Sequence, residues 1–242
     1  MSIQDQAISN MDALRANPYP GRGIVIGQTP DGSRMVQVYW IMGRSDNSRN
    51  RIFVDDGETV RTAPHDASKV EDPSLIIYNC TRVCGRAHIV TNGDQTDTIY
   101  DALVAGQSTD DALHTRTYEP DAPNYTPRIS GLIDQDAPVH AYTLSLLKTI
   151  DNDPSRPLRA FYNYERAIAG IGHFVSTYDG DGNPLPSFSG EPRPVQLLDD
   201  IDATRDLYWD ALNNDNKVSL LVKHIGSGTG STETRLVNKH AG

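Results

Sequence analysis

The sequence predicts an α+β fold in which antiparallel strands are layered with a few helices. Short apolar runs of strand length, separated by turn residues, occur along most of the chain. Apolar residues at helical spacing appear in only three or four places, and most strands are joined by hairpins rather than by crossover helices. Parallel sheets need long crossover connections, so this order favours antiparallel sheets over repeated βαβ units.

The composition is that of a soluble globular protein. Of the 242 residues, 37% are apolar and 22% are charged, and no apolar run is long enough to span a bilayer. The polar N-terminus lacks the basic start and apolar centre of a signal peptide, so we expect a cytoplasmic protein. The net charge of −10 argues against general affinity for nucleic acid or membrane, but a local group of arginines still suits a small anionic ligand.

The first half of the chain is expected to form one helix followed by paired strands. Ile3, Ala7, Met11 and Leu14 are spaced to form one apolar face of a helix over residues 3–16. Turn residues then separate apolar runs that we expect to pair as hairpins. These strands are expected at 23–27, 35–42, 51–54, 59–62, 75–80 and 83–91.

The second half is expected to add three helices and further strands. Asp94 or Thr96 is placed to cap a helix over 97–105, and Ser108 and Asp111 have the spacing of an acidic capping box. The remaining elements are an amphipathic helix at 195–212, an internal loop at 150–157, and strands at 129–133, 139–147, 160–164, 170–178, 217–225 and 232–237. We expect a single domain over 1–242, with 1–18 as an N-terminal helical extension and 179–194 as a long surface loop.

The stretch from Tyr39 to Phe53 is the first candidate for a functional site. Two apolar runs flank a polar centre that holds three arginines and two asparagines. Guanidinium groups present a planar fork of donors that fits phosphate and carboxylate groups. For this stretch alone, a solvated hairpin tip is the simpler interpretation.

Three further residues allow both a structural and a chemical interpretation. Cys80 is either a buried strand cysteine, which we favour, or a nucleophile near Arg82. Tyr78 shares a strand face with Cys80 and is either a core tyrosine or part of a site. Glu119 is either a solvated loop acid or a positioned general base. Cys80 and Cys84 lack the partners of a zinc site, and we expect both to be reduced thiols.

An ordered set of motifs resembles a known family. The motifs, which cover roughly residues 19–131, are Tyr19-Pro20-Gly21-Arg22-Gly23, Gly43-Arg44-Ser45 to Asn50-Arg51, Ile77-Tyr78-Asn79-Cys80, Val90-Thr91-Asn92-Gly93 with Thr96-Asp97, and Tyr118-Glu119 followed by Tyr125-Thr126-Pro127-Arg128-Ile129. In this order they resemble the archaeal-type IMP cyclohydrolase family. The N-terminal helix and the proline-rich loop resemble additions of a bacterial branch.

The resemblance implies a fold, a reaction and a class of ligand. The implied fold is the four-layer αββα sandwich of N-terminal nucleophile hydrolases. The implied reaction is that of a hydrolase acting on cyclic amidines, which closes 5-formamidoimidazole-4-carboxamide ribonucleotide to IMP and water. The implied partners are this purine nucleotide and IMP, with no metal or organic cofactor, and the family tends to form a homo-oligomer.

The start of the first expected strand is compatible with the implied reaction. N-terminal nucleophile hydrolases place Cys, Ser or Thr there, whereas this chain has Gly21-Arg22-Gly23. A cyclohydrolase needs no such residue, because the attacking nitrogen belongs to the substrate. This difference disfavours amidohydrolase chemistry.

The resemblance also assigns roles to individual residues. It implies that the catalytic residues are Arg51, Tyr78 and Glu119. Substrate-binding candidates are Asn50, Asn79, Asn92 and Arg128, followed by Arg22, Arg44 and Arg49. Two alternatives stay open, namely a non-catalytic purine-nucleotide-binding protein and a divergent amide hydrolase that uses Cys80.

Overall fold

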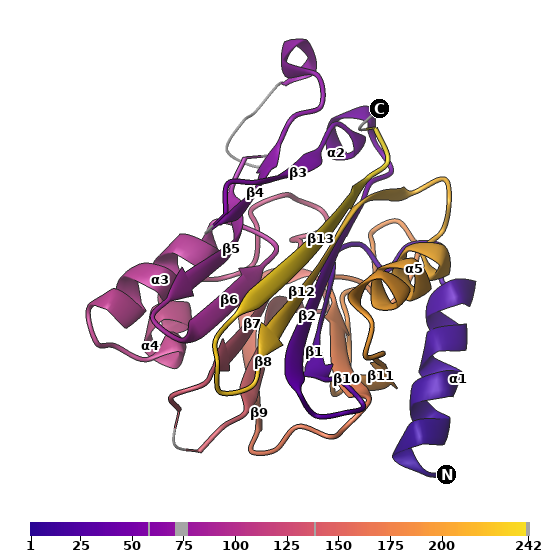
Figure 1. Ribbon diagram of the computed structural model, residues 1–242. Helices are drawn as coiled ribbons and strands as arrows, with labels where there is room; N and C mark the ends of the chain where they lie inside the picture. Colours follow the sequence, from indigo (N-terminus) through magenta and orange to yellow (C-terminus); the bar gives the residue numbers. More distant parts are fainter. Residues whose placement is uncertain (58, 71–76, 138, 241–242) are drawn as a thin grey trace.

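The computed structural model describes residues 1–57, 59–70, 77–137 and 139–240, and its strands form two antiparallel sheets (Figure 1). Over these residues sheet A has the order β11 (Arg193–Gln196), β10 (Ile171–Ser176), β1 (Gly23–Gln28), β2 (Arg34–Met42), β12 (Lys217–Gly226) and β13 (Thr232–Asn238). Sheet B has the order β3 (Ile52–Asp55), β4 (Val60–Ala63), β5 (Asn79–Cys84), β6 (Ala87–Thr91), β7 (Arg128–Asp134), β8 (Tyr142–Ile150) and β9 (Asp153–Tyr164). The expected α+β class is therefore confirmed.

Helices cover the outer face of each sheet. The helices α1 (Ile3–Ala16) and α5 (Ile201–Ala211) pack on sheet A, whereas α3 (Gln95–Val104) and α4 (Thr109–His114) lie on the side of sheet B (Figure 1). The short helix α2 (Asp46–Arg49) and a 3₁₀ turn at Ala67–Lys69 lie next to the start and the end of the β3–β4 hairpin. The layers follow the expected order αββα, while kinship with N-terminal nucleophile hydrolases stays a prediction. None of the helices in the described part of the chain has the length and apolar character of a bilayer span.

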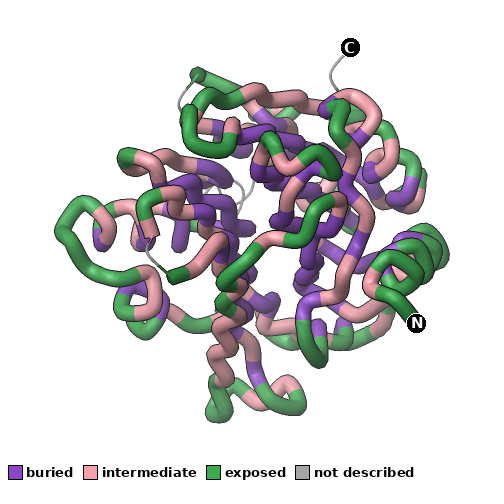
Figure 2. The backbone as a smooth tube through the Cα atoms, turned by 60° about the horizontal axis from the view of Figure 1, so that its bottom comes forward, coloured by how far each residue is buried: buried purple, intermediate pink, exposed green. Residues whose placement is uncertain are grey.

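The core occupies three levels because both sheets are covered on both faces. Ile24, Ile26 and Val90 are buried between the sheets, and Trp40 stacks on Tyr208 of α5 behind sheet A. Figure 2 shows the buried residues concentrated in the interior of the molecule, with exposed residues at the outer loops and ends. The sheets approach closely at Gly131, where a Cβ atom would lie 2.4 Å from the Cδ1 atom of Ile26.

The predicted N-terminal helix and two hairpins of sheet A are confirmed. The α1 helix begins with a capping box between Ser2 and Asp5, and it buries Ala7, Met11 and Leu14 as its spacing indicates. The β1–β2 and β12–β13 hairpins have the expected positions.

Two expected strand boundaries in sheet B are wrong. The strand expected at 83–91 begins only at Ala87, because Gly85 takes a left-handed conformation (φ 60°) and the β5–β6 hairpin turns there. β5 begins at Asn79, and part of the strand expected at 75–80 lies outside the described residues. The expected loop at 150–157 is instead a tight turn at Asp151 and Asn152, which both have positive φ, and β9 starts directly after it.

The expected helix at 195–212 is shorter than predicted. Residues 193–196 pair with β10 as the edge strand β11, so α5 begins only at Ile201. The carboxylate of Asp200 accepts a hydrogen bond from the backbone N–H of Ala203 and caps the helix at that point.

Candidate active site

The two sheets contribute side chains to one polar cluster, which is buried except that Arg22 is partly exposed. Arg22 precedes β1 and Tyr39 lies on β2, whereas Arg51 precedes β3 and Tyr78 precedes β5. The Tyr39 and Tyr78 hydroxyls are 2.8 Å apart and share a hydrogen bond across the gap between the sheets. Glu119, from the segment between α4 and β7, lies close enough to Arg22 and Arg51 for electrostatic interaction. The structure thus brings the three expected catalytic residues together and adds Arg22 and Tyr39. We call these five residues the buried cluster.

The backbone at Arg22 is fixed by a glycine and by the end of β10. Gly21 has a φ of 72°, and a Cβ atom on it would lie 2.2 Å from the Thr177 hydroxyl. Thr177 accepts a hydrogen bond from the Arg22 N–H through its hydroxyl (3.1 Å) and donates its own N–H to the Arg22 carbonyl (2.9 Å). Only a residue without a side chain permits this approach, so Gly21 determines where Arg22 enters the site.

Arg51 is held by the turn that follows α2. The side chain of the preceding Asn50 accepts a hydrogen bond from the Asp66 N–H (2.7 Å) and donates one to the Asp66 carbonyl (2.8 Å). This pair ties the turn to the segment after β4, and Arg51 is left only 5% exposed. Its Nε and Nη1 atoms are buried without a hydrogen-bond partner among the described residues, as is Nε of Arg22. Unpaired buried donors are rare and destabilising, so donors of this kind indicate a site for an acceptor group.

Tyr78 is positioned through its backbone by β4. Its N–H donates to the Thr62 hydroxyl (3.0 Å), and its carbonyl accepts from the Thr62 N–H (2.9 Å). Burial raises the pKa of Tyr78, although Arg51 and Arg22 act to lower it. The phenol is therefore protonated at neutral pH and can serve as a proton donor.

Glu119 is carried by a loop with its own internal scaffold. Its N–H donates to the Thr126 carbonyl (2.9 Å), and Asp121 accepts from the Thr126 N–H (2.6 Å). The Thr126 hydroxyl lies 2.6 Å from the hydroxyl of Tyr178, which connects the loop to the end of sheet A. Burial raises the pKa of Glu119 above its ordinary value even though Arg22 lies nearby. A carboxyl group with a raised pKa is a stronger proton acceptor than an ordinary carboxylate, which suits a general base.

The cluster carries an excess of positive charge. Burial lowers the pKa of Arg51 and the neighbouring Arg22 lowers it further, whereas for Arg22 the effect of Glu119 and the tyrosines exceeds that of burial and raises the pKa. Guanidinium groups stay protonated in proteins, so two cations face a single carboxylate. This balance favours an anionic or strongly polarised ligand.

The other predicted ligand residues Asn79, Asn92 and Arg128 have their polar groups engaged by neighbouring protein groups. The Asn79 amide donates to Asp97, and the Asn92 amide donates to the Pro127 carbonyl and accepts from the Ile129 N–H. Arg128 is near enough to act on Glu119 electrostatically, but its Nη1 atom bonds Asp94 and Gln95. The Asp94 carboxylate thus bonds arginine side chains and makes no capping hydrogen bond to α3.

Arg44 and Arg49 form contacts of a different kind. Arg44 pairs with Asp181 and lies 4.9 Å over the ring of Tyr19, whereas Arg49 donates to the Gly43 carbonyl (3.0 Å). These contacts fix loops, and a ligand role for either arginine stays a prediction.

Two tyrosines of the site carry no signal in the sequence. Tyr39 lies in an apolar run of β2 whose residues are buried on both faces of the strand. The sequence therefore does not show which residues face the layer between the sheets. Tyr178 follows β10, and burial raises its pKa. Both tyrosines reach the site only because segments that are distant in the sequence lie side by side in the fold.

The surroundings of Cys80 disfavour a thiolate nucleophile. The thiol is fully buried and donates to the Val60 carbonyl (3.0 Å). Burial raises the pKa of Cys80, so the reactive thiolate form is scarce at neutral pH. Within the described ranges, no group of three or more His, Cys, Asp and Glu side chains is arranged to hold a metal ion.

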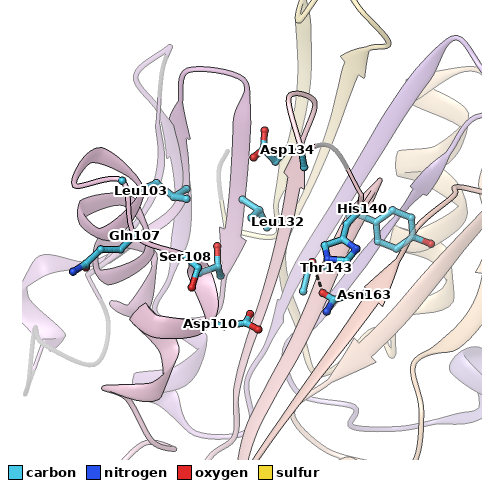
Figure 3. A pocket seen from close by; sticks show the side chains of 13 residues that line it. Leu103, Gln107, Ser108, Asp110, Leu132, Asp134, His140, Thr143 and Asn163 are labelled. Carbon is cyan, nitrogen blue, oxygen red and sulfur yellow. Dashed lines mark hydrogen bonds between the residues drawn. The ribbon is translucent and has the colours of Figure 1, made fainter.

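A separate pocket of about 450 Å³ lies on the other side of sheet B, between the α3–α4 corner and strands β7 to β9 (Figure 3). Its walls include Leu103, Leu132, Asp110, Asp134 and His140. It shares no residue with the buried cluster, so the chemistry considered below does not use it.

Comparison with known proteins identifies the family of this chain. The model of the family described as IMP cyclohydrolase-like protein matches residues 19–229. The chain is 36% identical over 128 residues to an IMP cyclohydrolase of Methanococcus maripaludis (strain C7), covering 51% of this chain and 62% of that protein. It is 30% identical over 172 residues to an IMP cyclohydrolase of Methanococcus aeolicus, covering 69% of this chain and 83% of the relative.

A third relative is the IMP cyclohydrolase of Methanopyrus kandleri, which is 37% identical over 120 residues, 48% of this chain and 59% of that protein. The alignments with the first and third relatives thus span less than two thirds of those proteins. The family match, in contrast, includes all the residues of the buried cluster. The chain therefore belongs to the IMP cyclohydrolase-like family.

Proposed function

We propose that this protein closes the purine ring of 5-formamidoimidazole-4-carboxamide ribonucleotide to give IMP and water. The observation that carries the proposal is the buried cluster, in which guanidinium donors of Arg22 and Arg51 that have no partner among the described residues lie near Tyr78 and Glu119. Relatives named IMP cyclohydrolase supply the identity of the reaction.

The first step of the proposed reaction joins two groups of one substrate. The carboxamide nitrogen attacks the formyl carbon, the new C–N bond forms, and the formyl oxygen takes on negative charge. Arg51 polarises this oxygen and stabilises its charge, which is most effective at a buried site. Glu119 orients the carboxamide and accepts the proton that its nitrogen loses.

The second step releases water. Glu119 returns its proton to the charged oxygen of the tetrahedral intermediate, Tyr78 donates a second proton to the resulting hydroxyl, and the C–O bond breaks as water leaves. The exocyclic nitrogen that carried the formyl group loses its proton as the C=N bond forms, and this proton restores Tyr78 to its neutral form. Because the attacking nitrogen and the formyl carbon belong to one molecule, the protein's main tasks are to hold them together and to move protons.

The remaining residues of the site hold and position the nucleotide. Arg22 supplies a second positive charge, and Arg128 lies next to Glu119 at the edge of the cluster. The proposed roles of Asn50, Asn79 and Asn92 are indirect, since their amides fix the segments that carry the cluster and the adjoining loops.

The test is conversion of the formamido ribonucleotide by purified protein dialysed against a chelator, followed by absorbance and by chromatography of IMP. Catalytic formation of IMP supports the proposal, and Glu119→Gln should abolish most of it. Binding of IMP without turnover would instead identify a purine-nucleotide-binding protein. Neither turnover nor binding would show that the ligand is wrong.

A further inference from the structure

The last residue of β13 joins the edges of the two sheets. Oδ1 of Asn238 accepts a hydrogen bond from the Phe53 N–H (2.7 Å), and its Nδ2 donates to the Phe53 carbonyl (3.0 Å). The amide thus meets both backbone groups of one residue on β3, as a neighbouring strand would. β13 is one of the two edge strands of sheet A, and β3 is one of the two edge strands of sheet B.

The segment held by Asn238 carries one half of the proposed site. Phe53 lies two residues after Arg51, and its ring packs against Tyr39 with 5.5 Å between ring centroids. Phe53 is also opposite Thr62 in the β3–β4 register, and Thr62 binds the backbone of Tyr78. The position of β3 is therefore coupled to Arg51, Tyr39 and Tyr78.

The coupling matters because the buried cluster is divided between the sheets. Sheet A supplies Arg22 and Tyr39, whereas Arg51 and Tyr78 belong to sheet B. A second contact from sheet A reaches the same segment, since the Ser219 hydroxyl lies 3.5 Å from the Arg51 carbonyl. At that length this bond is weak, so the two short bonds of Asn238 are the stronger restraint.

We infer that Asn238 is a positioning residue, which sets the place of Arg51 relative to Arg22 and Tyr39 through the backbone of Phe53. The inference rests on the proposed function. Asn238 forms no part of the buried cluster, and its effect on turnover passes through β3.

The test compares Asn238→Ala with the matched control Asn10→Ala. Asn10 donates its amide to the Pro194 carbonyl (2.8 Å) and joins α1 to β11, on elements that carry no residue of the cluster. We expect Asn238→Ala to lower kcat about 10- to 100-fold with a small change in KM, because a small displacement of a catalytic group is enough for such a loss. Asn10→Ala should leave both constants unchanged at a comparable loss of thermal stability.

The pH profile provides a readout that general loosening would not move. The groups that act on Glu119 are Arg22, Arg128, Asp121 and Arg51. Moving Arg51 away removes one influence that lowers the pKa of Glu119, so the acid limb of the kcat profile should shift to higher pH in Asn238→Ala only. An unchanged kcat and profile in this variant would overturn the role of Asn238.

Two outcomes need separate treatment. If the unsubstituted protein shows no turnover, the proposed function fails, and that result is visible before any variant is made. If Asn238→Ala does not fold, Asn238→Asp replaces it, because the carboxylate keeps the acceptor for the Phe53 N–H but replaces the donor with an oxygen that the Phe53 carbonyl repels. We expect Asn238→Asp to lower kcat as well, and full kcat in it would equally refute the inference.

Discussion

Replacement of Tyr78 by phenylalanine separates the proposed proton donor from the structure that surrounds it. The change removes one hydroxyl and keeps the ring, so the packing of the buried side chain is retained. A well-placed acid contributes about 100- to 10,000-fold to a rate, or roughly 3–5 kcal/mol of barrier. Tyr78→Phe should therefore reduce kcat within this range with little change in KM.

The same change also has a structural effect that can be measured independently. The Tyr39 hydroxyl loses the partner that it meets at 2.8 Å, and an unsatisfied buried hydroxyl costs about 1–3 kcal/mol. For a chain of this size, each kcal/mol lowers Tm by about 2–4 °C.

Tyr39→Phe is the matched control, because it breaks the same hydrogen bond from the other side. Its loss of thermal stability should be similar, while turnover should stay within about tenfold of the unsubstituted protein since the proposed donor is retained. Steady-state kinetics and thermal unfolding of both variants give the comparison. Equal losses of kcat in the two variants would refute the assignment of Tyr78 as the donor and leave only a shared structural role.

Three further predictions concern other buried groups. Lys223 is 6% exposed, and burial lowers its pKa from 10.5 to about 8. Between about pH 8 and pH 10.5 the unfolded chain therefore binds more protons at this residue than the folded protein does. Stability should therefore rise with pH across that window, and Lys223→Met should stabilise the protein at pH 7 by up to about 3 kcal/mol in denaturant unfolding. Cys80 should resist thiol reagents in the native state while the half-buried Cys84 reacts, and Cys80→Ala should keep full turnover; loss of turnover would restore the amide-hydrolase alternative. Because burial raises the pKa of Glu119, the acid limb of the kcat profile should have its midpoint above pH 4.5, and Glu119→Gln should remove that limb along with most of the rate.

Much of the fold could be predicted because its signals are local. The stripe of apolar residues in α1 and the turn residues of the sheet A hairpins act within a few positions. The elements that were mispredicted depend on long-range contacts. β9 is an edge strand with many exposed residues, so its first part has the composition of a loop. Val195 was assigned to the helix because it is apolar, but it belongs to β11, which pairs with β10.

The site was less accessible to sequence reasoning. Arg51, Tyr78 and Glu119 were identified through a family resemblance, and their spacing in the chain carries no geometric information. Whether an asparagine faces a ligand or a backbone group is decided by distant segments, as Asn50 and its partner Asp66 show. For the same reason Tyr39 could not be distinguished from an ordinary core residue.

The close approach of the sheets at Gly131 has a consequence for how activity can vary within this fold. The thickness of the layer between the sheets is determined by side-chain volumes such as those of Ile24, Ile26 and Val90, which face Gly131. A cluster whose members are divided between two sheets is sensitive to the distance between those sheets. Core substitutions that add or remove a methyl group therefore change the distance between the sheets. They can alter turnover although the substituted residues do not contact the ligand.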